Sequence, residues 1–330
     1  MLTTGTRSHE VSLMTDQRHH TRPKTTDALQ TFAGNSDVIV QAGEVADMRF
    51  QRGQSLSLRA AKLFLLLVQE AGVRVVENQQ HRIPYSLLNE TFHRGKGELL
   101  DAIYELHGTT ISVRVTAAGS RPFTRTGAIL SDVEREDEDL AGAEIRFEFS
   151  KAMREVIRSS THWAAISRRA VMAFESKYAL RLYLVLALRA GLRKTSEDFT
   201  LEDFRALVGV DAGSLDRWQD IKRRVLEPAR EEINHLAGFR MEFAPIKRGR
   251  KVIGVKLLWG RKGSAELVEA AQELERPRVG RKARRTEKVE ELAEQQAHLR
   301  AALAEELAAA PQQGRNIDHD APRNPKDTGS

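Results

Sequence analysis

The sequence predicts an α+β protein made of two tandem winged-helix domains, each a helix-turn-helix followed by a β-hairpin wing. Two observations predict this fold: the order of helix and strand patterns in residues 175–262, and a second copy of that order about 120 residues earlier. Positive charge is concentrated in the later copy, which favours a polyanionic partner. We expect a disordered tail over residues 1–48, a first winged helix over 49–155 and a second over 156–262. A charged, partly helical or disordered tail follows over 263–330.

The later copy shows the complete helix-turn-helix pattern. It begins with the apolar helix pattern SKYALRLYLVLALRAGL, and the short helix FTLEDFRALVGV follows. Thr200 and Asp203 have the spacing of a capping box, which starts a helix. Gly209 to Gly213 supply the turn, a long basic helix begins at Ser214, and two strand patterns flank KRGRK.

The earlier copy repeats this order with few matching residues. Its first helix pattern starts at Ser55, against Ser176 in the later copy, and its third helix is GKGELLDAIYELHG. TTISVRV and AEIRFEFS alternate with the period of two that is typical of strands, with FTRTGAILSD between them. We expect a buried stripe on the third helix, formed by Leu99, Ile103, Tyr104 and Leu106.

Composition narrows the class of protein. A formal charge of +6 and a pI near 9.6 favour a polyanionic partner. The absence of cysteine excludes disulfides, thiolate metal sites and cysteine nucleophiles, and is typical of a reducing cytoplasm. No apolar run approaches the roughly 20 residues that a membrane span needs. We therefore expect a cytoplasmic protein that does not bind membranes.

The basic helix of the later copy is the candidate for reading DNA bases. On a helical wheel, Leu215, Trp218, Ile221 and Val225 fall on the side that should pack against the core. The opposite side carries the base-reading candidates Arg217, Asp220, Arg223 and Arg224. Such a helix can enter the major groove, where arginine donates two hydrogen bonds to guanine.

Two further features belong to this helix. Lys222 points towards the apolar side, and we expect its ammonium group to reach a phosphate. Pro228 removes a hydrogen bond to the Arg224 carbonyl and should kink the helix. The alternative is an ordinary solvated helix face, on which Asp220 and Arg224 form an i,i+4 ion pair.

The hairpin predicts phosphate contacts. Its turn carries Lys247, Arg248, Arg250 and Lys251 around Gly249, and Arg261 with Lys262 should extend this patch. In the first half, Arg94 and Lys96 precede a helix N-terminus, where main-chain amides also attract phosphate. The alternative is that cationic hairpin tips only protect strand edges from aggregation. Residues 168–262 hold about 21 Lys and Arg against about 12 Asp and Glu, the distribution of a nucleic-acid footprint.

No pattern indicates catalysis, a cofactor or a metal. RGKGELL lacks the residue order of a P-loop. His19 and His20 have no further ligand at metal-binding spacing. An acidic run at Glu136–Asp139 could hold Mg²⁺ in a polymerase or nuclease, but it is more typical of a solvated loop. We therefore expect no catalytic residue, no cofactor and no metal ligand.

These motifs resemble those of a known family. ESKYALRLYLVLALRAG, FTLEDFRALVGV and DIKRRVLEPAREEINHLAGFRMEF are similar to the C-terminal half of the iteron-binding plasmid replication initiators. The resemblance covers Trp163 to about Trp259 well and Ser55 to Ser150 in outline. By position, the family's recognition helix falls on Ser214–Val225 and its wing on Lys247–Lys251.

The resemblance implies a protein that binds direct repeats, called iterons, in the double-stranded DNA of a plasmid origin. The second domain would dominate recognition, and the first would contribute auxiliary DNA contacts and dimerisation. A monomer–dimer equilibrium and recruitment of the host replication initiator and the replicative helicase are also implied. Two alternatives remain: a winged-helix transcriptional repressor without a replication role, and an enzyme that uses the acidic run.

Overall fold

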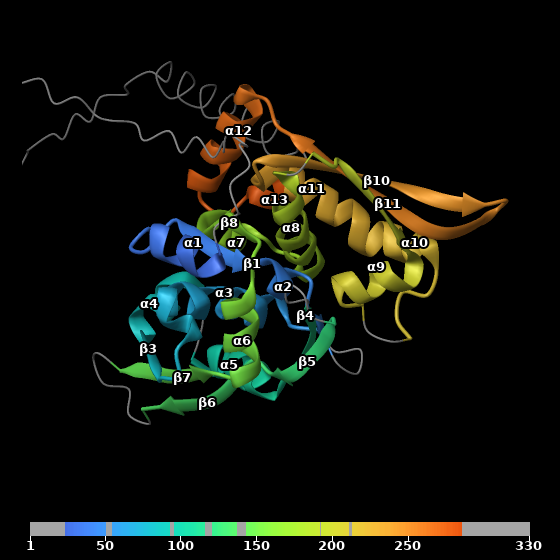
Figure 1. Cartoon of the computed structure of the whole chain (residues 1–330). Helices are drawn as coiled ribbons and strands as arrows, with labels where there is room; N and C mark the ends of the chain where they lie inside the picture. Colours follow the sequence, from blue (N-terminus) through green and yellow to red (C-terminus); the bar gives the residue numbers. More distant parts are fainter. Residues whose placement is uncertain are drawn as a thin grey trace, which may run out of the picture. The chain divides into compact units, whose positions relative to one another are not determined.

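Figure 1 shows the computed structural model, which describes residues 24–50, 55–92, 96–115, 121–136, 143–191, 193–210 and 213–285, without the side chains of 89–97 and 115. The chain divides into two compact units, residues 1–277 and 278–330. In its described part, the second unit contains one short helix, α13 (Arg281–Arg285). Both winged-helix domains lie in the first unit.

The first domain contains three α-helices and two antiparallel sheets. Its elements are α3 (Leu58–Ala71), the 3-10 helix η2 (Gly72–Val76), β3 (His81–Pro84), α4 (Tyr85–Phe92), α5 (Lys96–Gly108), β4 (Thr110–Val115), β5 (Phe123–Ala128), β6 (Leu130–Arg135) and β7 (Glu144–Phe149). One sheet has the order β3-β7-β6, and the other has the order β2-β4-β5, where β2 is Arg49–Phe50. The alternating burial of β7 places Ile145, Phe147 and Phe149 in the core.

The second domain repeats this order with a shorter set of strands. Its elements are α8 (Lys177–Ala190), β9 (Ser196–Thr200), α9 (Leu201–Val208), α10 (Trp218–Ile221), the π-helix η3 (Lys222–Leu226), α11 (Glu227–Leu236), β10 (Phe239–Arg248) and β11 (Lys251–Arg261). β9 pairs with the last strand, β11, as β3 pairs with β7 in the first domain. The expected tandem winged-helix fold is therefore confirmed.

Serine and threonine caps fix where the main helices begin. The hydroxyl oxygens of Ser57, Ser176 and Thr200 accept hydrogen bonds from the backbone N–H three residues ahead, at 3.1, 3.3 and 3.0 Å. α9 ends at Gly209, whose φ of 70° is the left-handed conformation that glycine adopts without strain. The predicted Thr200 cap and the glycine turn are both present.

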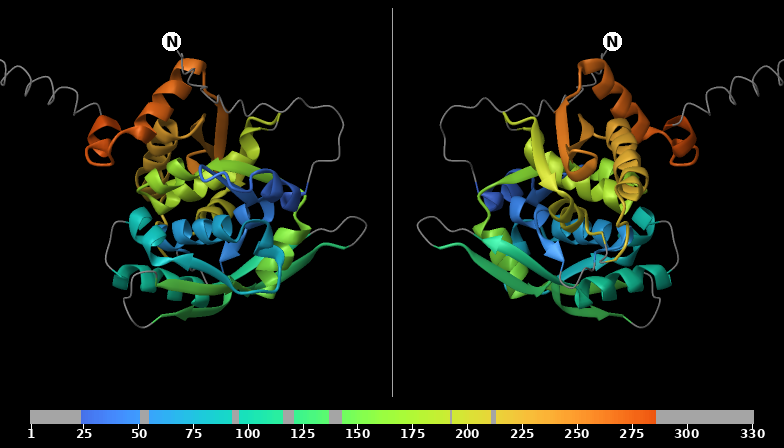
Figure 2. Two further views of the ribbon diagram at one scale, coloured as in Figure 1. Left: turned by 90° about the vertical axis from the view of Figure 1, so that its left-hand side faces the viewer. Right: turned by 90° about the vertical axis from the view of Figure 1, so that its right-hand side faces the viewer.

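Residues 24–48 differ from the expected disordered tail. They form α1 (Thr25–Thr31), β1 (Val38–Ala42) and α2 (Gly43–Ala46). β1 pairs with β8 (Trp163–Ser167), which lies between α6 (Lys151–Ser159) and α7 (Arg168–Ala173) in the segment joining the domains. Residues 24–48, blue in Figures 1 and 2, lie between the two domains. The sequence does not predict β1, because its partner strand β8 lies over 120 residues away. Residues 1–23 and 286–330 lie outside the described residues.

Three details of the helices also differ from expectation. Tyr104 is 57% exposed, so it is not part of the buried stripe of α5. The basic helix begins at Trp218 rather than at Ser214. Just before Pro228 the chain forms the π-helix η3, which continues into α11. The wider π-helical turn accommodates Pro228, because proline has no N–H to donate in an i→i−4 hydrogen bond.

Part of the expected C-terminal tail is helical and packed. α12 (Ser264–Glu275) buries Ala270 and Glu273, and the Glu273 carboxylate lies 3.5 Å from His235 Nε2 of α11. In the described ranges, no helix is long and apolar enough to cross a membrane.

Candidate nucleic-acid interface

Contacts made by a residue of α9 stabilise the turn between α9 and α10. Arg205 of α9 donates a hydrogen bond to the Leu215 carbonyl, and its Nη1 lies 3.5 Å from Asp216 Oδ1. Leu215 has a φ of 53°, a left-handed conformation that costs a non-glycine residue about 1–2 kcal/mol. Arg205 therefore fixes a strained turn that determines where α10 begins.

The structure brings three of the four base-reading candidates together. Asp220 Oδ1 lies 3.6 Å from Arg223 Nη2 and 4.0 Å from Arg224 Nε. Arg223 and Arg224 are nevertheless 70% and 61% exposed. Such exposed pairs contribute little to stability, so they orient the guanidinium groups without sequestering them. Arg217 is exposed at the N-cap of α10 and is not part of this cluster.

The ammonium group of Lys222 forms an ion pair within the protein, whereas we expected it to be free to reach a phosphate. Its Nζ lies 3.3 Å from Glu227 Oε1, five residues ahead. The π-helical bond pattern of η3 joins residues five apart and so brings both side chains to one face. A phosphate contact by Lys222 would have to compete with Glu227.

The wing tip projects beyond the three-stranded sheet. β9 pairs only with Gly254–Leu258 of β11, so the hairpin beyond Gly254 is a two-stranded arm. Gly249 takes a φ of 60° in the two-residue turn. Lys247, Arg248, Arg250 and Lys251 are all exposed on this arm, and none forms an ion pair with a residue that the structure describes. The arm therefore presents four cations to solvent.

Arg261 and Lys262 do not extend this patch. β11 runs from Lys251 to Arg261, and at about 3.3 Å per residue Arg261 lies roughly 33 Å from the tip. Lys262 is 8% exposed, and its Nζ donates to the Asn234 carbonyl at 2.6 Å, in the last turn of α11. Burial lowers the pKa of Lys262. Lys262 thus binds a helix C-terminus, and we remove it from the candidate phosphate contacts.

The first domain presents a different surface. Arg94 lies outside the described residues, and Lys96 begins α5 without a described side chain. The described outward face of α5 carries Asp101 and Tyr104, and Glu98 forms an ion pair with Arg59 at 2.9 Å. This face is unlike the basic face of α10 and η3.

The acidic run is partly paired. The carboxylate of Glu136 lies 3.7 Å from Arg146 Nη2, whereas Asp137, Glu138 and Asp139 lie outside the described residues. Within the described part of the chain, no group of three His, Asp or Glu side chains is placed to hold a metal ion.

Contacts of α11 connect the basic helix to the wing. Arg230 Nη1 lies 3.6 Å from Glu242 Oε2 of β10, and its guanidinium lies over the Phe243 ring at 5.6 Å. Figure 1 shows α10 and the free end of the hairpin on the same side of the unit. The exposed arginines and the cationic arm therefore belong to one continuous helix–hairpin assembly.

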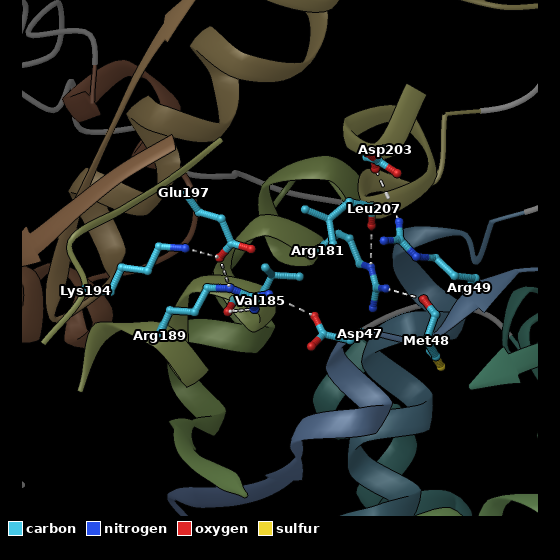
Figure 3. Close-up of polar contacts among 10 residues, drawn as sticks. All are labelled: Asp47, Met48, Arg49, Arg181, Val185, Arg189, Lys194, Glu197, Asp203 and Leu207. Carbon is cyan, nitrogen blue, oxygen red and sulfur yellow. Dashed lines mark hydrogen bonds and ion pairs between the residues drawn. The ribbon is translucent and has the colours of Figure 1, made fainter. Parts of the chain in front are cut away.

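Two functional candidates were missed by sequence reasoning, Arg205 and Arg181. Arg181 lies within an otherwise apolar, buried stretch of α8, from Ala179 to Leu186. An arginine inside such a stretch must find hydrogen-bond partners when it is buried, and this was the available signal. Its contacts are drawn in Figure 3 and are described below.

The fold and this surface define a tandem winged-helix protein of the DNA-binding type. The family model described as "Initiator Replication protein, WH1" matches residues 39–187, and "Initiator Rep protein, WH2" matches residues 200–259. The chain belongs to this family of initiator Rep proteins, which are DNA-binding proteins.

Two solved structures are similar to this chain. One is the Pi initiator protein in complex with iteron DNA, which is 14% identical with a TM-score of 0.49, covering 70% of this chain and 100% of that one. The other is the WH1 domain of MSBI1.176, a replication protein isolated from a multiple sclerosis patient. It is 20% identical with a TM-score of 0.25, covering 32% of this chain and 82% of that one. A search among curated proteins finds no match.

Proposed function

We propose that this protein initiates plasmid replication by binding direct repeats in the plasmid origin, without catalytic activity of its own. The observation that carries the proposal is the match of both initiator models to consecutive parts of the chain, with exposed arginines and a cationic arm in the second. Bound protein would promote opening of the origin and recruit the host initiator and the replicative helicase. The protein would act in the cytoplasm, in equilibrium between monomer and dimer.

Different residues serve sequence reading and affinity in this proposal. Arg217, Arg223 and Arg224 read base edges in the major groove, and Asp220 orients the latter two. Lys247, Arg248, Arg250 and Lys251 contact phosphates beside that groove. Lys222, Arg261, Arg94 and Lys96 are secondary phosphate candidates.

Autonomous replication tests this function. A plasmid that carries only the gene, its flanking DNA and a selectable marker should replicate in a host that does not maintain the marker alone. Deleting the repeats, or interrupting the gene, should abolish replication, and supplying the protein in trans should restore it only in the second case. Repeat binding that shuts off a promoter, without replication of any of these plasmids, would establish a repressor instead.

A further inference from the structure

Arg181 is a buried cation that joins the two domains through backbone carbonyls. It is 8% exposed, its Nε donates to the Leu207 carbonyl at 2.9 Å, and its Nη2 donates to the Met48 carbonyl at 2.6 Å (Figure 3). No carboxylate of the described residues lies within ion-pair distance of this guanidinium. Burial lowers the pKa of Arg181 to about 10.

The two carbonyls belong to different domains. Leu207 lies in the last turn of α9, directly before the helix-turn-helix turn, so Arg181 caps that helix. Met48 lies between α2 and β2, and β2 pairs with β4 of the first domain through Arg49↔Ser112 and Phe50↔Ile111. One planar guanidinium thus fixes the turn of the second domain against a strand of the first.

Neighbouring contacts join the same two elements. Arg49 Nη1 donates to the Asp203 carbonyl of α9 at 3.3 Å, and Asp47 Oδ1 lies 3.3 Å from Arg189 Nη2 of α8. Arg189 in turn contacts Glu197 of β9 at 3.0 Å (Figure 3). The Arg181 guanidinium also lies over the Phe50 ring, 5.7 Å from its centroid. We call residues Asp47–Phe50 the coupling segment, since each of these four residues contacts the second domain.

We propose that Arg181 is a positioning residue for DNA binding: by tying the coupling segment to the helix-turn-helix turn, it sets the spacing at which the two domains meet one DNA duplex. This inference rests on the proposed function, in which the second domain reads the repeat and the first domain adds phosphate contacts through Arg94 and Lys96. Two linked modules bind more tightly than either alone only when their geometry matches the sites they bind. Loosening the coupling segment should therefore reduce affinity for a full repeat much more than affinity for the part that the second domain binds alone.

Arg181→Met tests this role because methionine keeps the apolar stem and removes both hydrogen bonds. The probes are two duplexes from the flanking DNA, one with a complete repeat and one with only the half that the second domain protects in a hydroxyl-radical footprint. Affinity for the complete repeat should fall about tenfold or more, with loss of the first domain's protection, whereas affinity for the half repeat should fall by only about two- to threefold, because there only the cap of α9 is lost. Arg181→Lys keeps one nitrogen donor group in place of the guanidinium fork, so its affinity for the complete repeat should lie between those of wild type and Arg181→Met. Arg74→Met, at an exposed arginine of η2, is the matched control and should bind as wild type does.

The outcomes separate this inference from the proposed function. Equal losses on both duplexes, or no loss on either, would overturn the positioning role while leaving repeat binding intact. Wild-type protein that does not distinguish a repeat from a scrambled duplex would overturn both. If Arg181→Met does not fold, the double variant Asp47→Asn, Arg49→Met decides instead; it alters partly exposed side chains of the coupling segment and should show the same selective loss.

Discussion

At the scale of single residues, the cations of the second domain divide by what they contact. Arg224 is exposed beside Asp220, Arg250 has no ion-pair partner among the described residues, and Lys262 is buried against the Asn234 carbonyl. For Arg224 we propose base reading and for Arg250 phosphate contact, whereas Lys262 caps a helix. Each role has its own dependence on DNA sequence and on salt.

Alanine substitutions should separate these roles. Arg224→Ala should reduce the preference for a repeat over a scrambled duplex by about 1–3 kcal/mol, the value of one bidentate contact. Arg250→Ala should weaken binding to both duplexes and lower the slope of log K against log salt by about one. Fluorescence anisotropy titrations at four salt concentrations measure both quantities.

Lys262→Ala is the matched control, because it removes a cation of the same domain that faces the protein. Its salt slope should equal that of wild type, while its melting temperature falls. A lowered slope in Lys262→Ala, or an unchanged slope in Arg250→Ala, would show that the phosphate contacts have been assigned to the wrong cations.

His81 gives the first domain a dependence on pH. Its ring is buried against Phe147 and Phe149, with centroids 5.4 and 5.9 Å away. Burial, and then the charge of Arg74, lower the pKa of His81 below 6.5, while Glu77 and Glu148 oppose and Arg154 adds to the shift. The unfolded chain therefore binds a proton more readily than the folded chain, and stability falls as pH drops below about 6.5.

We expect the melting temperature of wild type to fall between pH 7.5 and 5 more steeply than that of His81→Phe, which cannot take up the proton. Differential scanning calorimetry across this range makes the comparison. Parallel curves for the two proteins would mean that His81 does not carry the acid sensitivity.

Single residues also mark where sequence reasoning stops. The exposed cations at the wing tip were predictable because a hairpin turn must be solvated. Lys262 and Arg181 were not, because the same side chain can face water or cap a helix, and the choice depends on distant carbonyls of Asn234 and Met48. Burial of a cation is decided by tertiary packing.

At the scale of elements, local sequence signals predicted the boundaries of α9 well, whereas strand pairings between distant segments could not be predicted. Thr200 with Asp203 and the glycine turn at Gly209 correctly predicted α9, because caps act within one helical turn. β1 was missed, since its partner β8 is brought to it only by the folded domains. The sequence predicted a kink at Pro228, whose missing N–H disturbs the helix locally, but it did not predict that the disturbance is the π-helix η3.

The sheet of the wing depends on a close approach at Gly254. A Cβ atom at this position would meet the Phe199 carbonyl of β9 well inside van der Waals contact, whereas one at Gly260 of the same strand would meet no atom within 4 Å. Gly254→Ala should lower the free energy of unfolding by about 1–3 kcal/mol through overpacking, and Gly260→Ala should change it little. Urea denaturation of both variants checks this; equal effects would show that β9 shifts to make room.

At the scale of the whole molecule, the proposed DNA binding requires two elements of one domain to act together. The helix from α10 to α11 contacts β10 through Arg230, and the hairpin continues past the sheet as a cationic arm. We propose that α10 with η3 and the tip of this arm contact a single duplex side by side. Resemblance of motifs predicted the two elements, and only the structure relates them through shared contacts.

Site-directed DNA cleavage tests this side-by-side arrangement. The sequence has no cysteine, so a single introduced cysteine can be labelled selectively. Gln219→Cys in α10 and Ile253→Cys in the arm, both exposed positions, would each carry an iron chelate that cuts nearby DNA. On a duplex with one repeat, we predict cuts from both positions on the same duplex, within about one helical turn of about 10 base pairs of each other. Cleavage from only one of the two positions, or cuts separated by several turns, would contradict the account.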